Sequence, residues 1–265
     1  MTRIAVAGAS GKMGRMLVEA TLAAPGLALA VALDRADSPE LGLDCAAFLG
    51  RPCGITIEAD LGALRRADVL IDFTRPQATA AHLAGCVDAG IGLVLGTTGI
   101  DDAGRQAIAD AAKRIPIMFA PNMSLGVNAA MRLVEVAAQM LGDDYDVEVI
   151  EAHHRHKVDA PSGTALKLGE LVAAARGVRL ADVAVTQREG HTGARRRGSI
   201  GFAAIRGGDI IGDHTVLFAA EGERIEITHR SSSRAGYAQG ALRAARFVHG
   251  RAAGLYEMRD VLAAS

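Results

Sequence analysis

This sequence has few aromatic residues, and it contains no tryptophan. Phe, Tyr and Trp together make up 3% of its 265 residues, whereas 50% of all residues are hydrophobic, so Ala, Val, Leu and Ile must build the core. The formal net charge is -1, which gives the chain no general attraction to nucleic acid or to an anionic membrane. We therefore expect neither as a partner, and any anion site must be local.

The sequence also lacks paired cysteine motifs, a signal peptide and a membrane span. The three cysteines are Cys45, Cys53 and Cys86. An odd number without a Cys-x-x-Cys pair predicts neither a disulfide framework nor a zinc ribbon, and it suits a reducing compartment. A strand pattern begins directly after Arg3, and the longest apolar stretch, 22–33, is short and interrupted by Pro25 and Gly26. These observations predict a cytoplasmic protein.

The first half of the chain alternates short apolar runs with helical stretches. The apolar runs are 4–7, 27–33, 69–73, 93–95 and 117–120. The stretches that suit helices are 12–23, 76–89 and 102–114. Strands that are apolar throughout are typical of parallel sheets covered on both faces. We predict an α/β fold that begins with a doubly wound, Rossmann-type parallel sheet.

The pattern changes near Asn122. A helix is expected over 127–141, followed by strands at 147–151, 200–205, 215–219 and 224–228, with apparent hairpin turns at 206–209 and 220–223. Alternation of charged and apolar residues in the last strand predicts a mixed or antiparallel sheet with one wet face. A helix at 238–249 and a short tail follow. We expect a dinucleotide-binding domain of 1–124 with 235–265, and an α+β substrate-binding and oligomerisation domain of 125–234.

A glycine-rich turn joins the first predicted strand to the first helix. Its sequence over 8–14 is Gly-Ala-Ser-Gly-Lys-Met-Gly, a variant of the commoner G-x-G-x-x-G motif. Gly8 permits the tight turn, Gly11 lets backbone N–H groups approach a pyrophosphate, and Gly14 lets the helix pack closely on the strand. The N-terminus of the helix would also favour the negative charge of the phosphates. The alternative interpretation is an ordinary tight turn that binds no ligand.

An acid and a base follow the second predicted strand. Asp34 comes 20 residues after Gly14, where an acid usually holds the adenosine ribose. Arg35 stands beside it, and an arginine there either meets the 2′-phosphate of NADP or is a surface charge. The pair predicts NADH, NADPH or both as cofactor. The loops over 96–99 and 120–123 end two further strands, where ligands of such sheets bind, although each also reads as a plain turn.

The densest chemistry lies over 148–165. Three histidines, an arginine and a lysine occupy 153–157, and a helix opened by Pro161 and Ser162 follows. Cations beside a helix N-terminus can hold a carboxylate, and an imidazole offers a proton donor near neutral pH. A solvated charged loop is one alternative. A metal site is another, with the candidate ligands Glu151, His153, His154 and His156. Adjacent strand residues point to opposite faces, so we expect no metal.

The pattern E-x-x-E-x-H-x-x-x-K-x-D-x-P-S-G-T-A over 148–165 resembles the signature of dihydrodipicolinate reductases, also called 4-hydroxy-tetrahydrodipicolinate reductases, of the diaminopimelate route to lysine. The similarity covers essentially the whole chain. It includes the glycine turn, Asp72-Phe73-Thr74, the loop 96–99, and the segments 188–193 and 258–262. Two features depart from the family pattern. Met123 stands where Phe is frequent, and 195–197 is an unusually basic loop, either solvated or able to capture an anion.

The resemblance implies a cytoplasmic homotetramer that uses NADH or NADPH. It assigns His153 as proton donor and Lys157 as a second catalytic donor. The positions that match contacts to the substrate dicarboxylate are His154, Lys157, Gly163, Thr164 and Arg234. The positions that match cofactor contacts are Gly8, Ala9, Ser10, Gly11, Lys12, Met13, Asp34, Arg35, Gly96, Thr97, Thr98, Ala120, Pro121, Asn122 and Met123.

The implied reaction is hydride transfer to C4 of a cyclic conjugated imine, with loss of water from the 4-hydroxy precursor. His153 would supply a proton, and closure of the two domains would bring substrate and cofactor together. Two alternatives stay open from the residues. One is another Rossmann reductase of an amino-acid intermediate, of the aspartate dehydrogenase kind. The other is an NAD-sensing protein without turnover, which the cluster of proton donors disfavours.

Overall fold

The computed structural model describes residues 1–264, which form two compact units. The first unit comprises 1–125 together with the stretch that begins at Ala235. The second unit comprises 126–234. No helix among the described residues is long and apolar enough to cross a membrane. Each unit has its own sheet and its own hydrophobic core.

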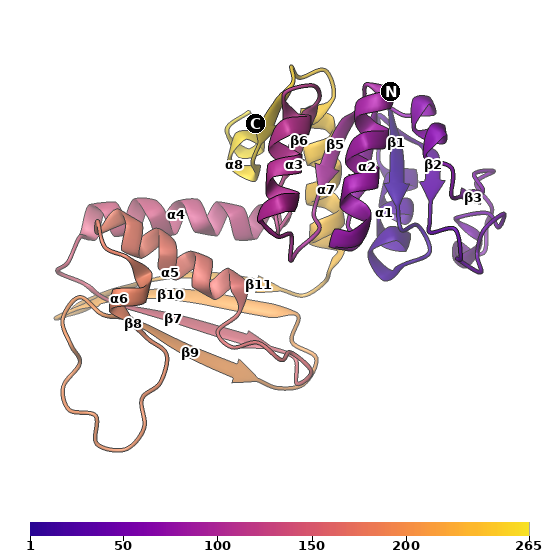
Figure 1. The fold of residues 1–265 in the computed structure, drawn as a ribbon. Coiled ribbons are helices and arrows are strands. Elements are labelled where there is room, and N and C mark those ends of the chain that lie inside the picture. Colours follow the sequence, from indigo (N-terminus) through magenta and orange to yellow (C-terminus); the bar gives the residue numbers. More distant parts are fainter. Residues whose placement is uncertain (265) are drawn as a thin grey trace. The chain divides into compact units, whose positions relative to one another are not determined.

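The first unit is built on a seven-stranded parallel sheet (Figure 1). Its strands are β1 (Thr2–Ala7), β2 (Leu27–Leu33), β3 (Ile57–Glu58), β4 (Val69–Asp72), β5 (Gly92–Leu95), β6 (Pro116–Phe119) and β12 (Gly254–Tyr256). Their order is β12-β6-β5-β4-β1-β2-β3. The order reverses at β1, which lies between β2 and β4, as in doubly wound folds. The Rossmann-type parallel sheet is therefore confirmed.

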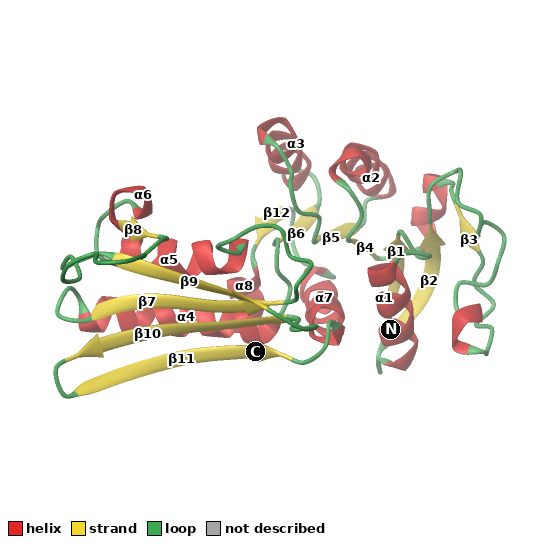
Figure 2. Ribbon diagram, turned by 90° about the horizontal axis from the view of Figure 1, so that it is seen from below, coloured by secondary structure: helices red, strands yellow, loops and turns green. Residues whose placement is uncertain are grey.

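Helices cover both faces of this sheet. They are α1 (Lys12–Ala23), α2 (Pro76–Ala89), α3 (Asp102–Ala112), α7 (Ala235–Val248) and α8 (Met258–Ala263), with the short 3₁₀ helices η1 (Ala47–Leu49) and η2 (Leu61–Arg66). Figure 2 shows α2 and α3 on one face and α1 and α7 on the other. The helix limits follow local signals. Pro76 starts α2 and Gly90, with φ +67°, ends it, while the Asp101 carboxylate caps α3.

The C-terminal tail contains more structure than its sequence predicts. After α7, the three residues of β12 pair with β6 and extend the sheet, and α8 follows. A reciprocal capping box between Glu257 and Asp260 starts α8. A three-residue strand is too short to show a period of two, so only its pairing with β6 identifies it.

The second unit is an α+β structure with a five-stranded sheet. Its elements are α4 (Leu125–Leu141), β7 (Asp146–His153), α5 (Gly163–Ala175), α6 (Leu180–Val183), β8 (Ala184–Val185), β9 (Ile200–Arg206), β10 (Gly212–Ala220) and β11 (Glu223–Ser231). The order is β11-β10-β7-β9-β8. Strands β11, β10 and β7 are antiparallel, whereas β7, β9 and β8 are parallel, so the predicted mixed sheet is confirmed.

One of the two predicted hairpins is wrong. Ala220 pairs with Glu223, and β10 and β11 form the expected hairpin around Gly222. The link at 206–209 does not form one, because β9 and β10 both pair with β7, which lies between them. A Gly-Gly turn predicts that the chain reverses but not which strand lies beside the returning segment.

The residues along β7 determine where the site of the second unit lies. Side chains alternate between the faces of a strand, and Val147 and Val149 point into the core with α4 and α5. Glu151 and His153 continue the same buried row. The register places His214 of β10 opposite Glu151. Three ionisable side chains therefore share the end of one hydrophobic face.

Candidate functional site

The turn between β1 and α1 requires glycine at two of its three glycine positions, Gly8 and Gly14. Gly8 has φ +67°, and the Gly11 amide donates to its carbonyl at 2.9 Å. A Cβ on Gly14 would lie 1.9 Å from the Gly8 carbonyl oxygen, so only a glycine lets α1 approach β1 this closely. Gly11 caps α1 without a side-chain bond, and the first turn carries no acid. This helix start suits an anion.

Asp34 lies directly against the glycine turn. One of its carboxylate oxygens accepts hydrogen bonds from the Ser10 amide at 2.9 Å and from the Ser10 hydroxyl, and the other accepts from the Arg35 amide at 2.8 Å. Arg35 itself is exposed and faces Asp37 at 3.2 Å. Asp34 is therefore positioned where the turn and a ribose would meet, and Arg35 is free to reach solvent beyond it.

The loops after β4, β5 and β6 share one edge of the sheet with the glycine turn. The Gly96 amide donates to the Asp72 carbonyl at 2.8 Å, and the Ala120 amide to the Leu95 carbonyl at 3.2 Å. Among the described residues, the buried hydroxyl of Thr97 has no hydrogen-bond partner. An orphaned buried hydroxyl at this edge, beside an uncapped helix start, fits a dinucleotide that supplies the missing partner. Met123 is fully buried in the core under α7.

A buried carboxylate–imidazole pair also lies at this edge, and sequence reasoning missed it. Asp72 is 0% exposed and lies 2.7 Å from Nδ1 of His82 on α2. Its other oxygen accepts from the amide and hydroxyl of Thr74 at 2.7 and 2.6 Å. Burial alone would raise the pKa of Asp72, but the hydrogen bonds from His82 and Thr74 outweigh it and lower that pKa. The hydrogen-bonded pair fixes the loop of Thr74, whose methyl group would lie 3.0 Å from a Cβ on Gly8.

In the second unit, Glu151 orients His153. A Glu151 oxygen lies 2.6 Å from Nδ1 of His153. Both residues are buried, with 1% of Glu151 and 8% of His153 exposed. A carboxylate on Nδ1 fixes the plane of the imidazole and leaves Nε2 for another partner. The Cα of Gly212 lies close to that nitrogen, since a Cβ there would be 3.0 Å from Nε2. The ring of His153 is thus held in a fixed orientation, as the predicted proton donor would require.

Arg206 and a backbone amide complete the surroundings of Glu151. Arg206, at the end of β9, donates to both Glu151 oxygens at 2.6 and 2.7 Å, and the Ser162 amide donates at 3.0 Å. Burial would raise the pKa of Glu151, but these hydrogen bonds and the one from His153 lower it. With both oxygens engaged, Glu151 has no lone pair left for a metal ion, which argues against the metal alternative at this cluster.

His214 forms the floor of the same cluster. Its ring lies edge-on to His153 with centroids 5.1 Å apart, and its Nε2 is 3.0 Å from the Ser162 hydroxyl. Burial, and then repulsion from His153, lowers the pKa of His214 to about 4. His214 is therefore neutral near pH 7, so it supports the ring of His153 without adding a second charge.

The low pKa of His214 predicts a loss of stability in acid. An unfolded histidine titrates near its usual pKa of 6.5, so between pH 6.5 and about 4 the unfolded chain binds more protons than the folded one. The free energy of unfolding is therefore highest above pH 6.5. It falls as the pH decreases through this window, by at most about 3 kcal/mol in total. Urea denaturation at pH 7 and pH 5 should show this decrease in the free energy of unfolding, and the decrease should be smaller in His214→Gln. An equal decrease in the wild type and in the variant would contradict the low pKa of His214.

Lys157 and the start of α5 lie on the loop after β7. The Lys157 ammonium contacts both Asp159 oxygens at 2.7 and 2.8 Å, and this ion pair lowers the pKa of Asp159. Ser162 caps α5 by accepting from the Ala165 amide, so Gly163 and Thr164 form its first turn. Gly163 is exposed, and space is open around it. A cation on the loop that leads into an accessible helix start is an arrangement that can receive a carboxylate.

The two other predicted substrate contacts differ in their surroundings. The half-buried His154 follows His153, and its Nδ1 is buried without a partner among the described residues. Its ring is 6.2 Å from that of His156. Arg234 is exposed in the connection from β11 to α7, and no hydrogen bond or ion pair among the described residues joins it to the loop after β7. His153, His154, Lys157 and the start of α5 therefore lie on one continuous segment, whereas Arg234 comes from a separate connection.

Two profiles of one protein family together match nearly the whole chain. A family profile described as dihydrodipicolinate reductase, N-terminus, matches residues 2–123, and one described as dihydrodipicolinate reductase, C-terminus, matches residues 126–262. The chain belongs to the dihydrodipicolinate reductase family. The resemblance read from the sequence motifs is thereby confirmed.

Members of the family match along the whole chain. The 4-hydroxy-tetrahydrodipicolinate reductase of Herminiimonas arsenicoxydans is 62% identical over 261 residues, which cover 98% of this chain and 97% of that protein. The enzyme of the same name from Bordetella parapertussis is 61% identical over 260 residues, with coverage of 98% and 97%. A dipicolinate-bound dihydrodipicolinate reductase from Paenisporosarcina sp. TG-14 has the same fold, with a TM-score of 0.77, 26% identity and 97% coverage of both chains.

In the basic loop at 195–197, Arg195 is structural, whereas Arg196 and Arg197 are exposed. Arg195 donates to the Val147 and Ser199 carbonyls at 2.8 and 2.6 Å and pairs with Asp146 and Glu148. Its guanidinium is thereby saturated, which corrects the expectation of a plain solvated loop and leaves this residue unable to capture an anion. The exposed Arg197 approaches Asp144 at 3.4 Å. The loop thus fastens the amino end of β7.

Proposed function

We propose that this chain reduces 4-hydroxy-tetrahydrodipicolinate to tetrahydrodipicolinate with NADH or NADPH and a proton, releasing water, in lysine biosynthesis through diaminopimelate. Family membership and relatives about 60% identical that carry this name support the proposal. The observation that carries it is the buried Glu151–His153 pair beside Lys157 and the start of α5. It combines a directed proton donor with a site for carboxylates.

The first unit would hold the cofactor. The N–H groups of Gly11, Lys12 and Met13 would face the pyrophosphate, and Asp34 the adenosine ribose. The loops at 96–98 and 120–122 would contact the nicotinamide half, whereas Met123, which was also predicted to contact the cofactor, is fully buried and cannot reach it. When bound, the reduced nicotinamide supplies a hydride. The Asp34 and Arg35 pair supports use of both cofactors, because the carboxylate suits a free 2′-hydroxyl and the exposed guanidinium suits a 2′-phosphate.

The second unit would hold and protonate the substrate. Glu151 holds Nδ1 of His153, so Nε2 donates the proton as the reduced ring rearranges. The Lys157 ammonium would exchange Asp159 for a substrate carboxylate, with His154 and the amides of Gly163 and Thr164 as further donors. Arg234, which is exposed, would have to move toward the substrate to contact a carboxylate. Reaction requires the units to close around both ligands, which excludes water from the hydride path.

The direct test is turnover of purified full-length protein with 4-hydroxy-tetrahydrodipicolinate. We expect loss of reduced-nicotinamide absorbance with NADH and with NADPH, and a product lighter than the substrate by one oxygen atom. Oxaloacetate with ammonia serves as the substrate of an aspartate dehydrogenase. Turnover of that mixture alone, or tight NADH binding with no turnover at all, would refute the proposal.

A homotetramer in the cytoplasm is part of the same proposal. One face of the second unit's sheet carries no helix, and it presents Ile150, Ala152, Ile205 and Leu217 along β7, β9 and β10. Half-buried and exposed apolar side chains on an open sheet face suit packing against a second copy. The free thiols of the chain suit a reducing compartment. Light scattering should give the mass of four chains, whereas a monomer at micromolar concentration would contradict it.

A further inference from the structure

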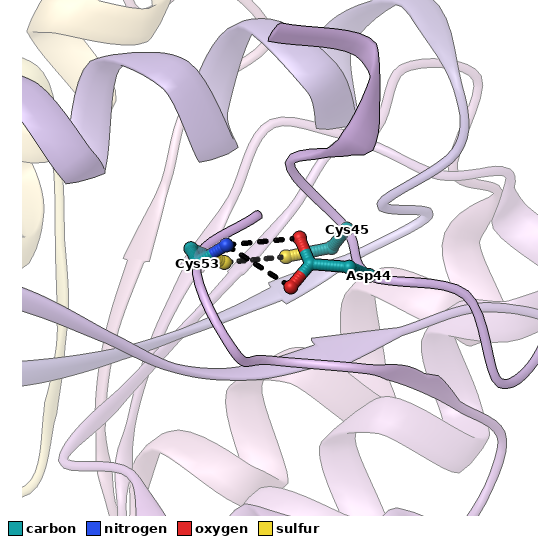
Figure 3. A group of neighbouring side chains, drawn as sticks. All are labelled: Asp44, Cys45 and Cys53. Carbon is teal, nitrogen blue, oxygen red and sulfur yellow. Dashed lines mark hydrogen bonds between the residues drawn. The ribbon is translucent and has the colours of Figure 1, made fainter. Parts of the chain in front are cut away.

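Two thiols and a carboxylate lie together in the segment between β2 and β3 (Figure 3). One ligand atom each from Asp44, Cys45 and Cys53 lies within 4.8 Å of the others. The two Sγ atoms are 3.6 Å apart, which is van der Waals contact. Cys45 is buried and Cys53 half-buried, while the third cysteine, Cys86, is buried on α2. This group lies outside the residues assigned to the reaction.

The Asp44 carboxylate closes the loop that carries the two cysteines. Its Oδ1 accepts from the amides of Ala46 at 2.8 Å and Cys53 at 3.1 Å, and its Oδ2 from those of Cys53 at 3.0 Å and Gly54 at 2.7 Å. Three N–H groups therefore surround the carboxylate, and the Cys53 amide is shared between both oxygens. The hydrogen bonds, first that from Ala46, lower the pKa of Asp44. A metal ion would have to displace them, so Asp44 is a clamp and not a ligand.

The thiols differ in how readily they ionise. Burial, and then the contact with Cys53, raises the pKa of Cys45 to about 12, so Cys45 is a neutral thiol near pH 7. Metal binding would require two thiolates beside a charged carboxylate, whereas a disulfide is uncharged and suits a buried position. Cys53 is the more exposed thiol and therefore the one that an external reagent reaches first.

We propose that Cys45 and Cys53 are a redox-active thiol pair, which a small-molecule disulfide of the glutathione class oxidises to an intramolecular disulfide. The Cys53 thiolate attacks one sulfur of the reagent, forms a mixed disulfide and expels one thiol. Cys45 then loses its proton to solvent and attacks Sγ of Cys53, expelling the second thiol. The protein loses two electrons and two protons, and the reagent gains them as two thiols.

The pair is linked to the dinucleotide turn through Arg15. The loop between the cysteines carries Phe48, whose ring centre is 5.4 Å from the Arg15 guanidinium. Arg15 donates to the Ser10 carbonyl at 3.1 Å and contacts Glu40 at 2.6 Å. A disulfide would draw Cys45 and Cys53 together and shift Phe48. The contact of Phe48 with Arg15, which holds the Ser10 carbonyl, would then weaken. Resting on the proposed cofactor binding, we expect oxidation to weaken NADH binding about two- to five-fold, the value of one exposed cation–π contact.

The first experiment tests the pair itself. Reduced full-length protein is incubated with oxidised glutathione, and peptides are analysed by mass spectrometry. We expect the peptide carrying both cysteines to lose two hydrogens, reversibly with dithiothreitol, and Cys45→Ser to retain a glutathione adduct on Cys53. Cys86→Ser is the matched control and should oxidise like wild type. A stable adduct on wild-type Cys53, or no modification, would overturn the pair. Cadmium binding at one equivalent that Asp44→Asn abolishes would overturn it in favour of a metal site.

The second experiment tests the link to the turn. NADH binding is measured by fluorescence for the reduced and the oxidised protein, with Cys53→Ser treated in the same way. We expect a weaker affinity only in oxidised wild type. Equal affinities with the disulfide formed would overturn the link. Failure of the reduced protein to bind NADH would instead refute the proposed cofactor site and leave the thiol chemistry to stand on its own result.

Discussion

His153→Ala should lower kcat about 10²- to 10⁴-fold, the range that a positioned general acid contributes. His153 is the imidazole of the cluster whose Nδ1 is held by a buried carboxylate, and its Nε2 makes no hydrogen bond to the described residues. The neutral His214 beside it cannot replace it, because its pKa of about 4 leaves it without a proton to give near pH 7. Steady-state kinetics at saturating cofactor, with NADH affinity measured separately, will show whether only the chemical step is affected.

A matched control separates this effect from the loss of any histidine. His249 is exposed after α7 in the first unit, so His249→Ala should leave kcat and KM within about two-fold of wild type. Turnover of His153→Ala at the wild-type rate, with the protein folded, would exclude His153 as the proton donor.

The positions of the first helices were readable from local chemistry alone. The predicted limits of 12–23 and 76–89 match α1 and α2, because Gly11 precedes one helix and Pro76 and Gly90 enclose the other. Five of the seven strands of the parallel sheet were equally readable from their continuous apolar runs, whereas the short strands β3 and β12 were not. What the sequence could not supply was pairing. The partner of β9 and the existence of β12 depend on contacts between segments far apart in the chain.

The same distinction holds for the site of the second unit. The motif over 148–165 pointed to His153, Lys157 and the start of α5, because they are close in sequence. Arg206 and His214 lie 55 and 52 residues from the partners that they contact, Glu151 and Ser162. In the sequence, Arg206 is only an arginine at the end of a predicted strand, and His214 is only a histidine next to an apolar one. Neither observation indicates a contact with the motif. Glu151 was considered only as a metal ligand, and its role in orienting His153 emerged from the fold.

Gly14→Ala should destabilise the first unit by about 3 kcal/mol or more and abolish measurable NADH binding. The added Cβ would lie 1.9 Å from the Gly8 carbonyl oxygen and 2.7 Å from its carbon. These are backbone atoms between a buried strand and a helix, so the clash cannot be relieved by turning a side chain, and α1 must move away from β1. That movement displaces the N–H groups that face the pyrophosphate. Thermal denaturation and NADH titration measure the two effects.

The matched control is the same substitution where there is room for it. Gly236 lies at the start of α7 with no atom within 4 Å of a built Cβ, so Gly236→Ala should be neutral or stabilise by up to about 1 kcal/mol, because alanine is the better helix former. Both variants replace a helical glycine of the first unit, and they differ in what the new methyl group meets. If Gly14→Ala were as stable as Gly236→Ala and bound NADH normally, close approach of α1 to β1 would not be what this turn requires.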